Sequence, residues 1–437
     1  MINLTIRSED YQTVEGGCEL QLGGYHMEKT YQTLYQVNLV LSVNGVNYQV
    51  NHSDIVTIAI IHNYDTMTFP IIRIRLQSDL ALLQNILEYP DAIEIVGDLN
   101  GNVYLLENDQ SKPTLVSGAH NISFKMKGYI EHKNMPTSIM DQYRDGKRIT
   151  TDLNQQSKVP IELYGYNQSL VYYMKRLTQS IYKDMGMTSI IEDMFSRGNI
   201  TKYNMDPLDQ QTRFEQVLIP NLNLLQALVY FDAYYGLYEK GCHIYGDLDQ
   251  LYMSNASSEV YGNIIPIQVM SSKNESDMVG LKKYNDNTYQ MSVMFNNVSV
   301  LSESDIERLM AAENIGAVNV NTNEIQSASL KELYQYKTNE IFGNQDIPHI
   351  LHKHVNPFIA TSNAARIKEK ITKIDLSAGG FDIGDMHVNT RYNILFDSSI
   401  RGDGIQGLYR PSFVNHILSN AGNNLLMSQT TMQLCKN

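Results

Sequence analysis

Three histidines lie close together in the second half of the chain. His349, His352 and His354 stand between two prolines, and Asp346 precedes them. On an extended segment His352 and His354 would share a face, and neutral imidazole nitrogens are good ligands for zinc and similar ions. No further carboxylate pattern completes a ligand set. The favoured interpretation is a loop with solvated histidines, or a pH-sensitive contact between subunits.

A pair of acids, Asp247 and Asp249, follows a predicted hairpin. Paired carboxylates serve in glycoside hydrolysis and in metal binding. This pair lacks the Asp/Asn-Gly continuation of a calcium loop, and a sequence does not give the separation between two carboxylates. A turn that carries solvated acids is the favoured interpretation.

Residues 402–407 read Gly-Asp-Gly-Ile-Gln-Gly and match the dinucleotide-binding pattern GxGxxG. That site needs a helix directly after the glycines, so that the helix N-terminus meets the pyrophosphate. Residues 408–411 read instead as extended chain, which predicts a loop between strands.

Phosphate-loop, GxSxG, HExxH and kinase signatures are missing. Cys242 and His243 are neighbours on a predicted strand and would point to opposite faces. We therefore predict no catalytic, cofactor-binding or metal-binding residues.

The charge balance argues against broad binding to nucleic-acid phosphates. Lys and Arg total 34, Asp and Glu total 47, and the net charge is −13, whereas phosphate binding needs clustered cations. The cysteines Cys18, Cys242 and Cys435 are far apart and imply no disulfide framework. No leader peptide or transmembrane stretch is recognisable. We expect a protein made in a reducing cytoplasm, without membrane insertion or sequence-specific nucleic-acid binding.

Antiparallel strands are predicted throughout the first part of the chain. Hydrophobic residues alternate over 37–43 and 46–50 on either side of Asn44-Gly45, which is the strongest short hairpin signal. A second such turn is predicted at Asn100-Gly101. Further strands are predicted at 56–60, 72–76 and 122–130. Ser78 is the predicted cap of a single helix over 79–87.

Helical spacing appears between residues 160 and 236. One helix is predicted from a hydrophobic stripe, a second from Thr188 to Gly198, and a third from Pro220 to Gly236. The stripe consists of Leu170, Tyr173, Met174, Leu177, Ile181 and Met185. A hairpin is then predicted over 237–245. Later strands are predicted at 289–295, 372–376, 392–396, 413–418 and 427–434, and helices at 304–314 and 329–341.

The order β, then α, then β predicts an α+β fold that is mainly antiparallel β. Two β-barrel or sandwich domains would flank an inserted helical domain. The predicted domains are 1–135, 136–236 and 237–437, the last with a peripheral insertion near 300–365. Alternating βαβ units are missing, which argues against a doubly wound parallel sheet.

Several short stretches resemble the baseplate hub proteins of phage tails, a late-control-protein-like family with tail-tube-like domains. In residues 218–238 a proline-led helix ends in a Tyr-Gly-x-Tyr corner, and 244–252 continues the likeness. Residues 68–76 resemble the tube-domain strand that precedes a short helix. Residues 407–410 and 428–434 resemble the closing strands of the same family.

This resemblance implies a non-enzymatic structural virion protein with two tube-like domains per subunit. Three subunits would form a ring that matches a sixfold tail tube on one side and a threefold spike on the other. DNA would pass through the ring lumen during ejection. The implied partners are the tail tube, central spike, tape-measure and baseplate wedge proteins, in a tail baseplate assembled in the host cytoplasm. The segment near 300–365 departs from the family pattern.

Two alternatives remain open. A tail-associated cell-wall hydrolase would use Asp247, Asp249 or the histidines between 349 and 354. A receptor-binding or wedge subunit is the other, although the long β-repeat or Gly-rich shafts of adhesins are missing from the sequence.

Overall fold

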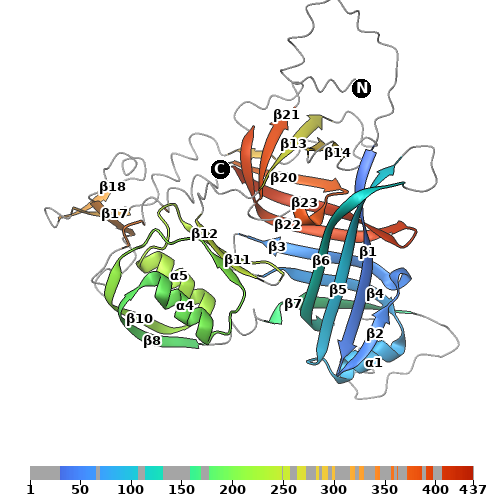
Figure 1. The fold of residues 1–437 in the computed structure, drawn as a ribbon, viewed down its shortest axis with the longest axis horizontal. Coiled ribbons are helices and arrows are strands. Elements are labelled where there is room, and N and C mark those ends of the chain that lie inside the picture. The colour runs from blue at the N-terminus through green and yellow to red at the C-terminus, as the bar shows by residue number, and fades with distance from the viewer. Residues whose placement is uncertain are drawn as a thin grey trace, which may run out of the picture.

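The computed structural model describes residues 30–64, 69–106, 114–130, 158–168, 177–248, 250–255, 263–271, 282–284, 288–293, 298–300, 315–319, 324–328, 340–344, 356–358, 362, 372–385, 390–396 and 406–436. Over these residues the chain is α+β and mainly antiparallel β, as the sequence predicts. A β-barrel continues into a second sheet, and a lobe with two helices lies beside them (Figure 1).

Eight antiparallel strands close into the barrel. Their hydrogen-bonded order is β22 (Gly407–Gly422), β3 (Ile55–Asn63), β4 (Ile71–Ser78), β7 (Val159–Tyr166), β6 (Thr114–Ile130), β5 (Ile93–Leu106), β1 (Thr30–Val43) and β23 (Leu425–Lys436). β23 pairs back onto β22, which closes the ring. Closure gives each of these strands a neighbour on both sides and so hides their edges.

Apolar and charged side chains alternate along β4, and this alternation assigns them to the inner and outer faces of the barrel. In the strand predicted at 72–76, Ile72, Ile74 and Leu76 point into the hydrophobic core. Arg73 and Arg75 lie on the other face, where both form ion pairs with Glu162 of β7. The outer face of this strand pair is therefore held by charge, and the inner face by apolar packing.

The Asn44-Gly45 turn is confirmed. Asn44 has φ 50° and Gly45 has φ 80°, and the turn joins β1 to β2 (Val46–Val50) in antiparallel register. Positive φ at both central residues is what a type I′ hairpin turn requires.

The helix predicted over 79–87 is also confirmed, as α1 (Leu80–Glu88). Its N-cap is Asp79 rather than Ser78, a difference of one residue that is usual at helix ends. Its apolar side chains join the barrel core: Leu82, Leu83, Ile86 and Leu87.

The second sheet grows from the last two strands of the chain. On the β23 side it adds β20 (Thr372–Gly379) and β16 (Val298–Val300), and on the β22 side β21 (Thr390–Phe396), β13 (Asn263–Ser271), β15 (Thr288–Val293) and β14 (Lys282–Tyr284). The strands predicted at 372–376, 392–396, 413–418 and 427–434 are thus confirmed, as is the described part, 289–293, of the strand predicted at 289–295. These strands surround a core of their own that includes Ile267, Tyr392 and Leu434.

β22 changes partners at Pro411. Before it, Tyr409 pairs with Tyr392 of β21; after it, Phe413 pairs with Asn63 of β3. The register with β23 shifts between Pro411 and Phe413. Proline has no N–H for a ladder, and a bulge bends a strand. This bulge lets one strand serve both the barrel and the second sheet.

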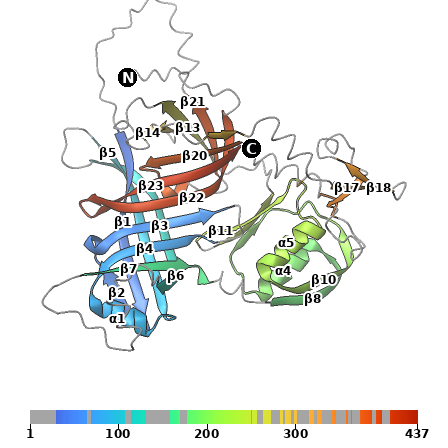
Figure 2. The same cartoon turned by 180° about the vertical axis from the view of Figure 1, so that it is seen from behind.

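The lobe packs two helices against short strands. Its elements are β8 (Leu177–Gly186), α4 (Met187–Arg197), β9 (Tyr203–Met205), β10 (Arg213–Asn223), α5 (Leu224–Tyr234), β11 (Cys242–Gly246) and β12 (Leu251–Asn255). Figure 2 shows α4 and α5 side by side, next to the β8–β10 ribbon. The predicted helix that ends at Gly198 is confirmed as α4.

The helix predicted from the hydrophobic stripe is wrong where the structure describes it. Residues 177–186 form β8, in which Ile181 pairs with Leu218 of β10. Tyr182 is buried while its neighbour Ile181 is exposed, which is the two-residue period of a strand. Pairing with β10 overrides the helical spacing. Leu170, Tyr173 and Met174 lie outside the described residues.

The third predicted helix begins later than expected. α5 starts after Asn223, whose side chain forms a capping box with Gln226. Pro220 lies in β10 instead, where the register shifts between Ile219 and Leu222. An irregular two-stranded ribbon tolerates a residue that has no N–H.

Two predicted hairpins are wrong. β5 runs without a break through Asn100-Gly101, since it pairs along its length with β1 and β6. A Cβ on Gly101 would lie 2.6 Å from the carbonyl oxygen of His120, so this glycine serves a close backbone approach. Residues 237–238 do not pair with 243–245, because β11 pairs with β12.

A small three-stranded sheet contains β17 (Ile315–Asn319), β18 (Glu324–Ala328) and β19 (Glu340–Asn344). The helix predicted at 304–314 and most of that at 329–341 lie outside the described residues; Glu340 and Ile341 belong to β19 rather than to a helix. Among the helices that the structure describes, none has the length and hydropathy to span a membrane.

The barrel draws strands from all three predicted domains. β7 comes from the segment 136–236, and β22 and β23 come from 237–437. Near the end of the expected peripheral insertion, the Asn356 amide donates to the carbonyl oxygens of Asp232 (2.8 Å) and Ala233 (3.1 Å) at the end of α5. The boundaries at 135 and 236 remain a prediction.

We expect Gly97→Ala to destabilise the barrel. Gly97 of β5 pairs with Phe124 of β6, and an added Cβ would lie 2.2 Å from Phe124 Cζ. Displacing this buried ring should lower the free energy of unfolding by about 1–3 kcal/mol, as measured by urea unfolding followed by circular dichroism. The matched control is Gly118→Ala on β6, where an added Cβ meets nothing within 4 Å. Equal midpoints for the two variants would contradict this packing.

Candidate functional site

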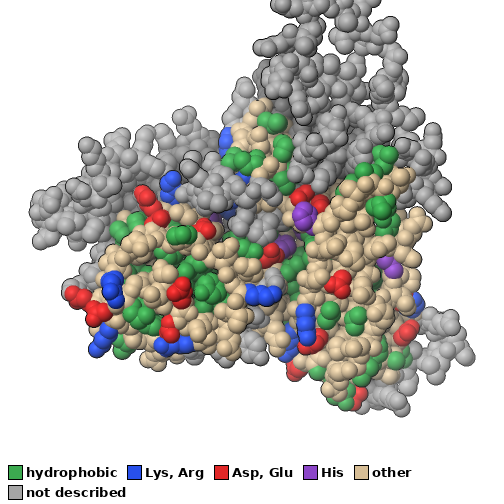
Figure 3. Space-filling view, in the orientation of Figure 1, with side chains coloured by type: hydrophobic (Ala, Val, Ile, Leu, Met, Phe, Trp, Pro, Cys, Tyr) green, Lys and Arg blue, Asp and Glu red, His purple; other side chains and the backbone are tan. Residues whose placement is uncertain are grey.

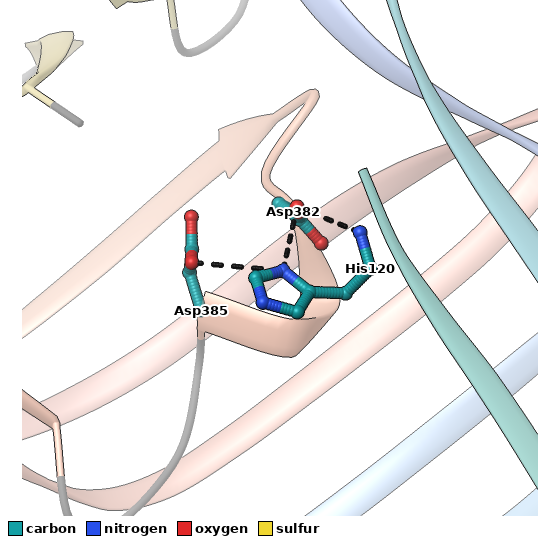
Figure 4. A group of neighbouring side chains, drawn as sticks. All are labelled: His120, Asp382 and Asp385. Atoms are coloured by element: carbon teal, nitrogen blue, oxygen red, sulfur yellow. Dashed lines mark hydrogen bonds and ion pairs between the residues drawn. The ribbon is translucent and has the colours of Figure 1, made fainter. Parts of the chain in front are cut away.

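Asp382 is a buried carboxylate at which distant parts of the chain meet (Figure 4). The residue is 1% exposed. Its Oδ1 accepts hydrogen bonds from the Tyr35 hydroxyl at 3.1 Å and the Gly384 N–H at 3.1 Å. Its Oδ2 accepts from the His120 N–H at 3.2 Å and lies 3.0 Å from His120 Nδ1. Donors on both oxygens offset the cost of burying the charge.

A tight turn positions this carboxylate. Asp382 follows β20 and directly precedes the short helix η6 (Ile383–Asp385). Gly380 has φ 81°, and its carbonyl oxygen accepts from the Thr33 N–H of β1 at 3.2 Å. Ser428 of β23 accepts from the Gly380 N–H and donates its hydroxyl to the Phe381 carbonyl, both at 2.7 Å. Strands of the barrel therefore fix the turn from two sides.

Two glycines admit His120 to the site. A Cβ on Gly384 would lie 2.3 Å from His120 Cβ, and one on Gly101 would lie 2.6 Å from the His120 carbonyl oxygen. His120 Nδ1 is also 3.8 Å from Asp385 Oδ1. The His120 side chain is 58% exposed, whereas that of Asp385 is 12% exposed. The site is thus closed beneath Asp382 and open on the imidazole side.

Tyr35 supports the site from inside the barrel. Its hydroxyl donates to Asp382 and accepts from the Ile383 N–H at 2.7 Å. Burial, reinforced by the charge of Asp382, raises the pKa of Tyr35 well above its ordinary value. The phenol therefore stays protonated and keeps its role as donor to the carboxylate.

The donor set of this site suits two roles. The network fastens β1 and β6 of the barrel to η6, next to the second sheet. In addition, one imidazole nitrogen and two carboxylate oxygens, from His120, Asp382 and Asp385, lie within 4.8 Å of one another. Imidazole and carboxylate together form a common ligand set for divalent metal ions.

Asp247 supports the turn between β11 and β12. Its N–H donates to the Gln250 carbonyl oxygen at 2.8 Å, and its Oδ1 accepts from the Leu248 N–H at 2.7 Å. These contacts account for this acid as a turn residue. Its predicted companion, Asp249, lies outside the described residues.

Most of the other residues singled out from the sequence lie outside the part of the chain that the structure describes. His349, His352 and His354 lie outside the described residues, as do positions 402–405. Gly407 begins β22. A strand thus follows the GxGxxG letters, as predicted, and the helix that a dinucleotide site needs is replaced by a strand.

His416 is a buried histidine inside the barrel. Its Nδ1 lies 2.8 Å from Thr430 Oγ1, and its ring is edge-on to that of His62, with centroids 6.2 Å apart. Burial, together with His62, lowers the pKa of His416 well below its ordinary value. A neutral imidazole bonded to a hydroxyl is best explained as a packed core residue.

A cleft of about 760 Å³ lies between the barrel and the lobe. Lys125, Lys127 and Lys202 line it together with acids, and Lys125 Nζ is 3.2 Å from Glu94. On the face drawn in Figure 3, basic and acidic side chains are likewise mixed. A cleft with charges of both signs does not form the cationic patch that phosphate binding needs.

Sequence reasoning missed the Asp382 site because no local spacing marks it. His120 and Asp382 are 262 positions apart, and Tyr35 and Asp382 are 347 apart. The only local signal is Asp382-x-x-Asp385 after a pair of glycines. That pattern is too common to have indicated a site.

The fold and this site define a β-rich protein whose barrel and second sheet share strands. The two modules also meet at a buried hydrogen-bond network around Asp382. Residues 28–436 match the family model described as Bacteriophage PBS1 gene 109 protein, and the chain belongs to this family. A search of curated protein sequences finds no match.

Several solved structures share a weak likeness with the chain. The tail protein from Neisseria meningitidis MC58 is 11% identical, with a TM-score of 0.46 over 92% of this chain and 97% of that one. The 43 kDa tail protein of prophage MuSo2 from Shewanella oneidensis is 10% identical, with a TM-score of 0.46 over 92% and 98%. The E. coli c3393 protein, described as a type VI secretion component similar to T4 tail proteins gp27 and gp5, is 8% identical, with a TM-score of 0.38 over 91% and 76%. The family match confirms that the chain belongs to a bacteriophage protein family, as the predicted resemblance implies.

We expect Asp382→Ala to be among the more destabilising single changes. It leaves the buried Tyr35 hydroxyl and the backbone donors without their acceptor, which should cost about 2–4 kcal/mol of unfolding free energy. Tyr35→Phe removes one part of the network and should cost about 1–2 kcal/mol. Urea unfolding followed by circular dichroism measures both.

The matched control for these variants is Asp375→Ala on β20. Asp375 is exposed and accepts a surface hydrogen bond from Gln433 at 3.1 Å, so its loss should change stability by no more than about 0.5 kcal/mol. An Asp382→Ala variant as stable as the Asp375→Ala variant would show that the buried network contributes little.

Proposed function

We propose that this protein is a non-enzymatic structural subunit of a phage tail, and specifically the central hub of the tail baseplate. The observation that carries the proposal is the pair of β modules within one chain, joined by β22 and β23. Membership of a bacteriophage protein family supports it. The resemblance of residues 218–238 to tail-hub proteins points in the same direction.

A ring of subunits would account for the open strand edges of the second sheet. The barrel closes on itself, whereas the second sheet ends at β14 and β16 in the described part of the chain. Open strand edges invite pairing with another chain. Three copies arranged in a ring would pair or cover such edges and would place six β modules around one axis. That arrangement matches a sixfold tube on one side and a threefold spike on the other.

The charge of the chain suits a ring through which DNA passes. The net charge is −13, and acids that face a lumen repel phosphates and so avoid trapping DNA. The proposed partners are the tail tube, central spike, tape-measure and wedge proteins. The proposed location is the tail baseplate of the virion, with assembly in the host cytoplasm.

We expect the protein to form a trimer when it is co-expressed with its tube and spike neighbours. The physical reason is that edge pairing between copies adds hydrogen bonds that a single chain cannot make. Native mass spectrometry and class-averaged electron microscopy of the purified assembly measure the stoichiometry and symmetry. A chain that stays monomeric with all these neighbours present would contradict the hub.

Imaging the same assembly also separates a hub from a receptor-binding or wedge subunit. A hub lies on the tail axis between tube and spike, whereas a wedge or receptor-binding subunit lies at the periphery. A peripheral position for antibody-labelled subunits would favour this alternative.

The cell-wall hydrolase alternative predicts an activity that we do not expect. Among the acids that the structure describes, Asp247 is the best candidate for this activity. The Asp247 carboxylate, however, is engaged in the β11–β12 turn. We therefore expect that the full chain does not clear a suspension of purified cell walls. The turbidity of the suspension measures this. Clearing that Asp247→Ala abolishes and Asp375→Ala retains would instead favour the hydrolase.

A further inference from the structure

We propose that His120, Asp382 and Asp385 bind a divalent transition-metal ion that clamps the barrel to the second sheet. The proposal concerns a metal site and does not depend on the hub function. It rests on the distances between the three side chains, the kind of ligand atoms they offer, and the groups that hold them in place.

The distances suit coordination of a single ion. His120 Nδ1 is 3.0 Å from Asp382 Oδ2 and 3.8 Å from Asp385 Oδ1. Nitrogen and oxygen ligands bind zinc at about 2.0–2.2 Å, which places neighbouring ligand atoms about 3–3.5 Å apart. An ion between the three atoms would replace the hydrogen bond from His120 Nδ1 to Asp382 with only small side-chain shifts.

The ligand atoms favour one class of ion. Calcium and magnesium prefer shells made of oxygen alone. An imidazole nitrogen with two carboxylates suits the series from Mn²⁺ to Zn²⁺. The exposed side of His120 leaves room for water molecules to complete the coordination shell.

Neighbouring groups hold the ligands before any ion binds. The Tyr35 hydroxyl and the Gly384 N–H occupy Asp382 Oδ1, which leaves Oδ2 directed at His120. Close contacts at Gly384 and Gly101 fix the position of His120. Such supporting hydrogen bonds orient carboxylates and imidazoles in metal sites and raise their affinity.

The position of the site gives the ion a structural consequence. His120 belongs to β6 of the barrel, and Asp382 and Asp385 belong to the turn between β20 and β21 of the second sheet. An ion bound to all three residues links the two modules. Since these ligands come together only in the folded chain, binding raises the melting temperature.

The test is metal binding by the full chain after treatment with EDTA and dialysis. Titration calorimetry with ZnCl₂ should show one saturable site per chain, and CoCl₂ should give a visible absorption band with the same stoichiometry. His120→Asn and Asp385→Asn should each weaken Zn²⁺ binding at least about tenfold. The matched control, His243→Asn on β11 of the lobe, should leave the affinity unchanged.

Melting curves distinguish a variant that has lost a metal ligand from a variant that has not folded. Without metal, both ligand variants should unfold in a cooperative transition, that of His120→Asn below the wild-type temperature because its hydrogen bond to Asp382 is lost. Only the wild type and His243→Asn should melt higher when Zn²⁺ is added. Absence of saturable Zn²⁺ and Co²⁺ binding by the wild type would overturn the proposal. Binding retained by both ligand variants would overturn it as well, since the ion would then lie elsewhere.

Discussion

The hairpin of β22 and β23 is the constraint on which both β modules depend. Its two strands pair from Tyr409↔Lys436 to Gly422↔Leu425, across a turn in which Asn423 and Asn424 have positive φ. At one end β22 meets β3 and β23 meets β1, which closes the barrel; at the other end β22 meets β21 and β23 meets β20. Because this hairpin comes late in the chain, neither module is complete until its residues are in place. Pairing between segments this far apart in sequence is expected to form slowly during folding.

The hydrogen bonds around the buried Asp382 carboxylate add to the connection that this shared hairpin makes between the barrel and the second sheet. Apolar packing is not directional, whereas a carboxylate with donors on both oxygens fixes one arrangement of its neighbours. Tyr35 and His120 bring two barrel strands to the turn after β20, and Ser428 holds the same turn from β23. The relative position of barrel and second sheet is thus set by hydrogen bonds as well as by shared strands.

The lobe joins the barrel through aromatic contacts. The rings of Tyr64 and Tyr245 meet edge to face, with centroids 5.6 Å apart, and Phe69 packs where Gly246 has no side chain. The Asn167 amide also donates to the Leu248 carbonyl oxygen at 2.7 Å. Ring packing and a hydrogen bond therefore tie the lobe to the barrel.

The sequence by itself determined those elements whose signals are local. Asn44-Gly45 specified a type I′ turn, the alternation in β4 separated its core face from its charged face, and the run before Gly198 specified α4, because each depends on the backbone preferences of neighbouring residues. Tertiary structure decided the rest. Residues 177–186 became a strand because β10 offered hydrogen-bond partners. Gly101 served a close contact with His120 rather than a turn, and Asp382 met its donors across hundreds of positions. Pairing and burial between distant segments are set by the whole fold, and no local spacing encodes them.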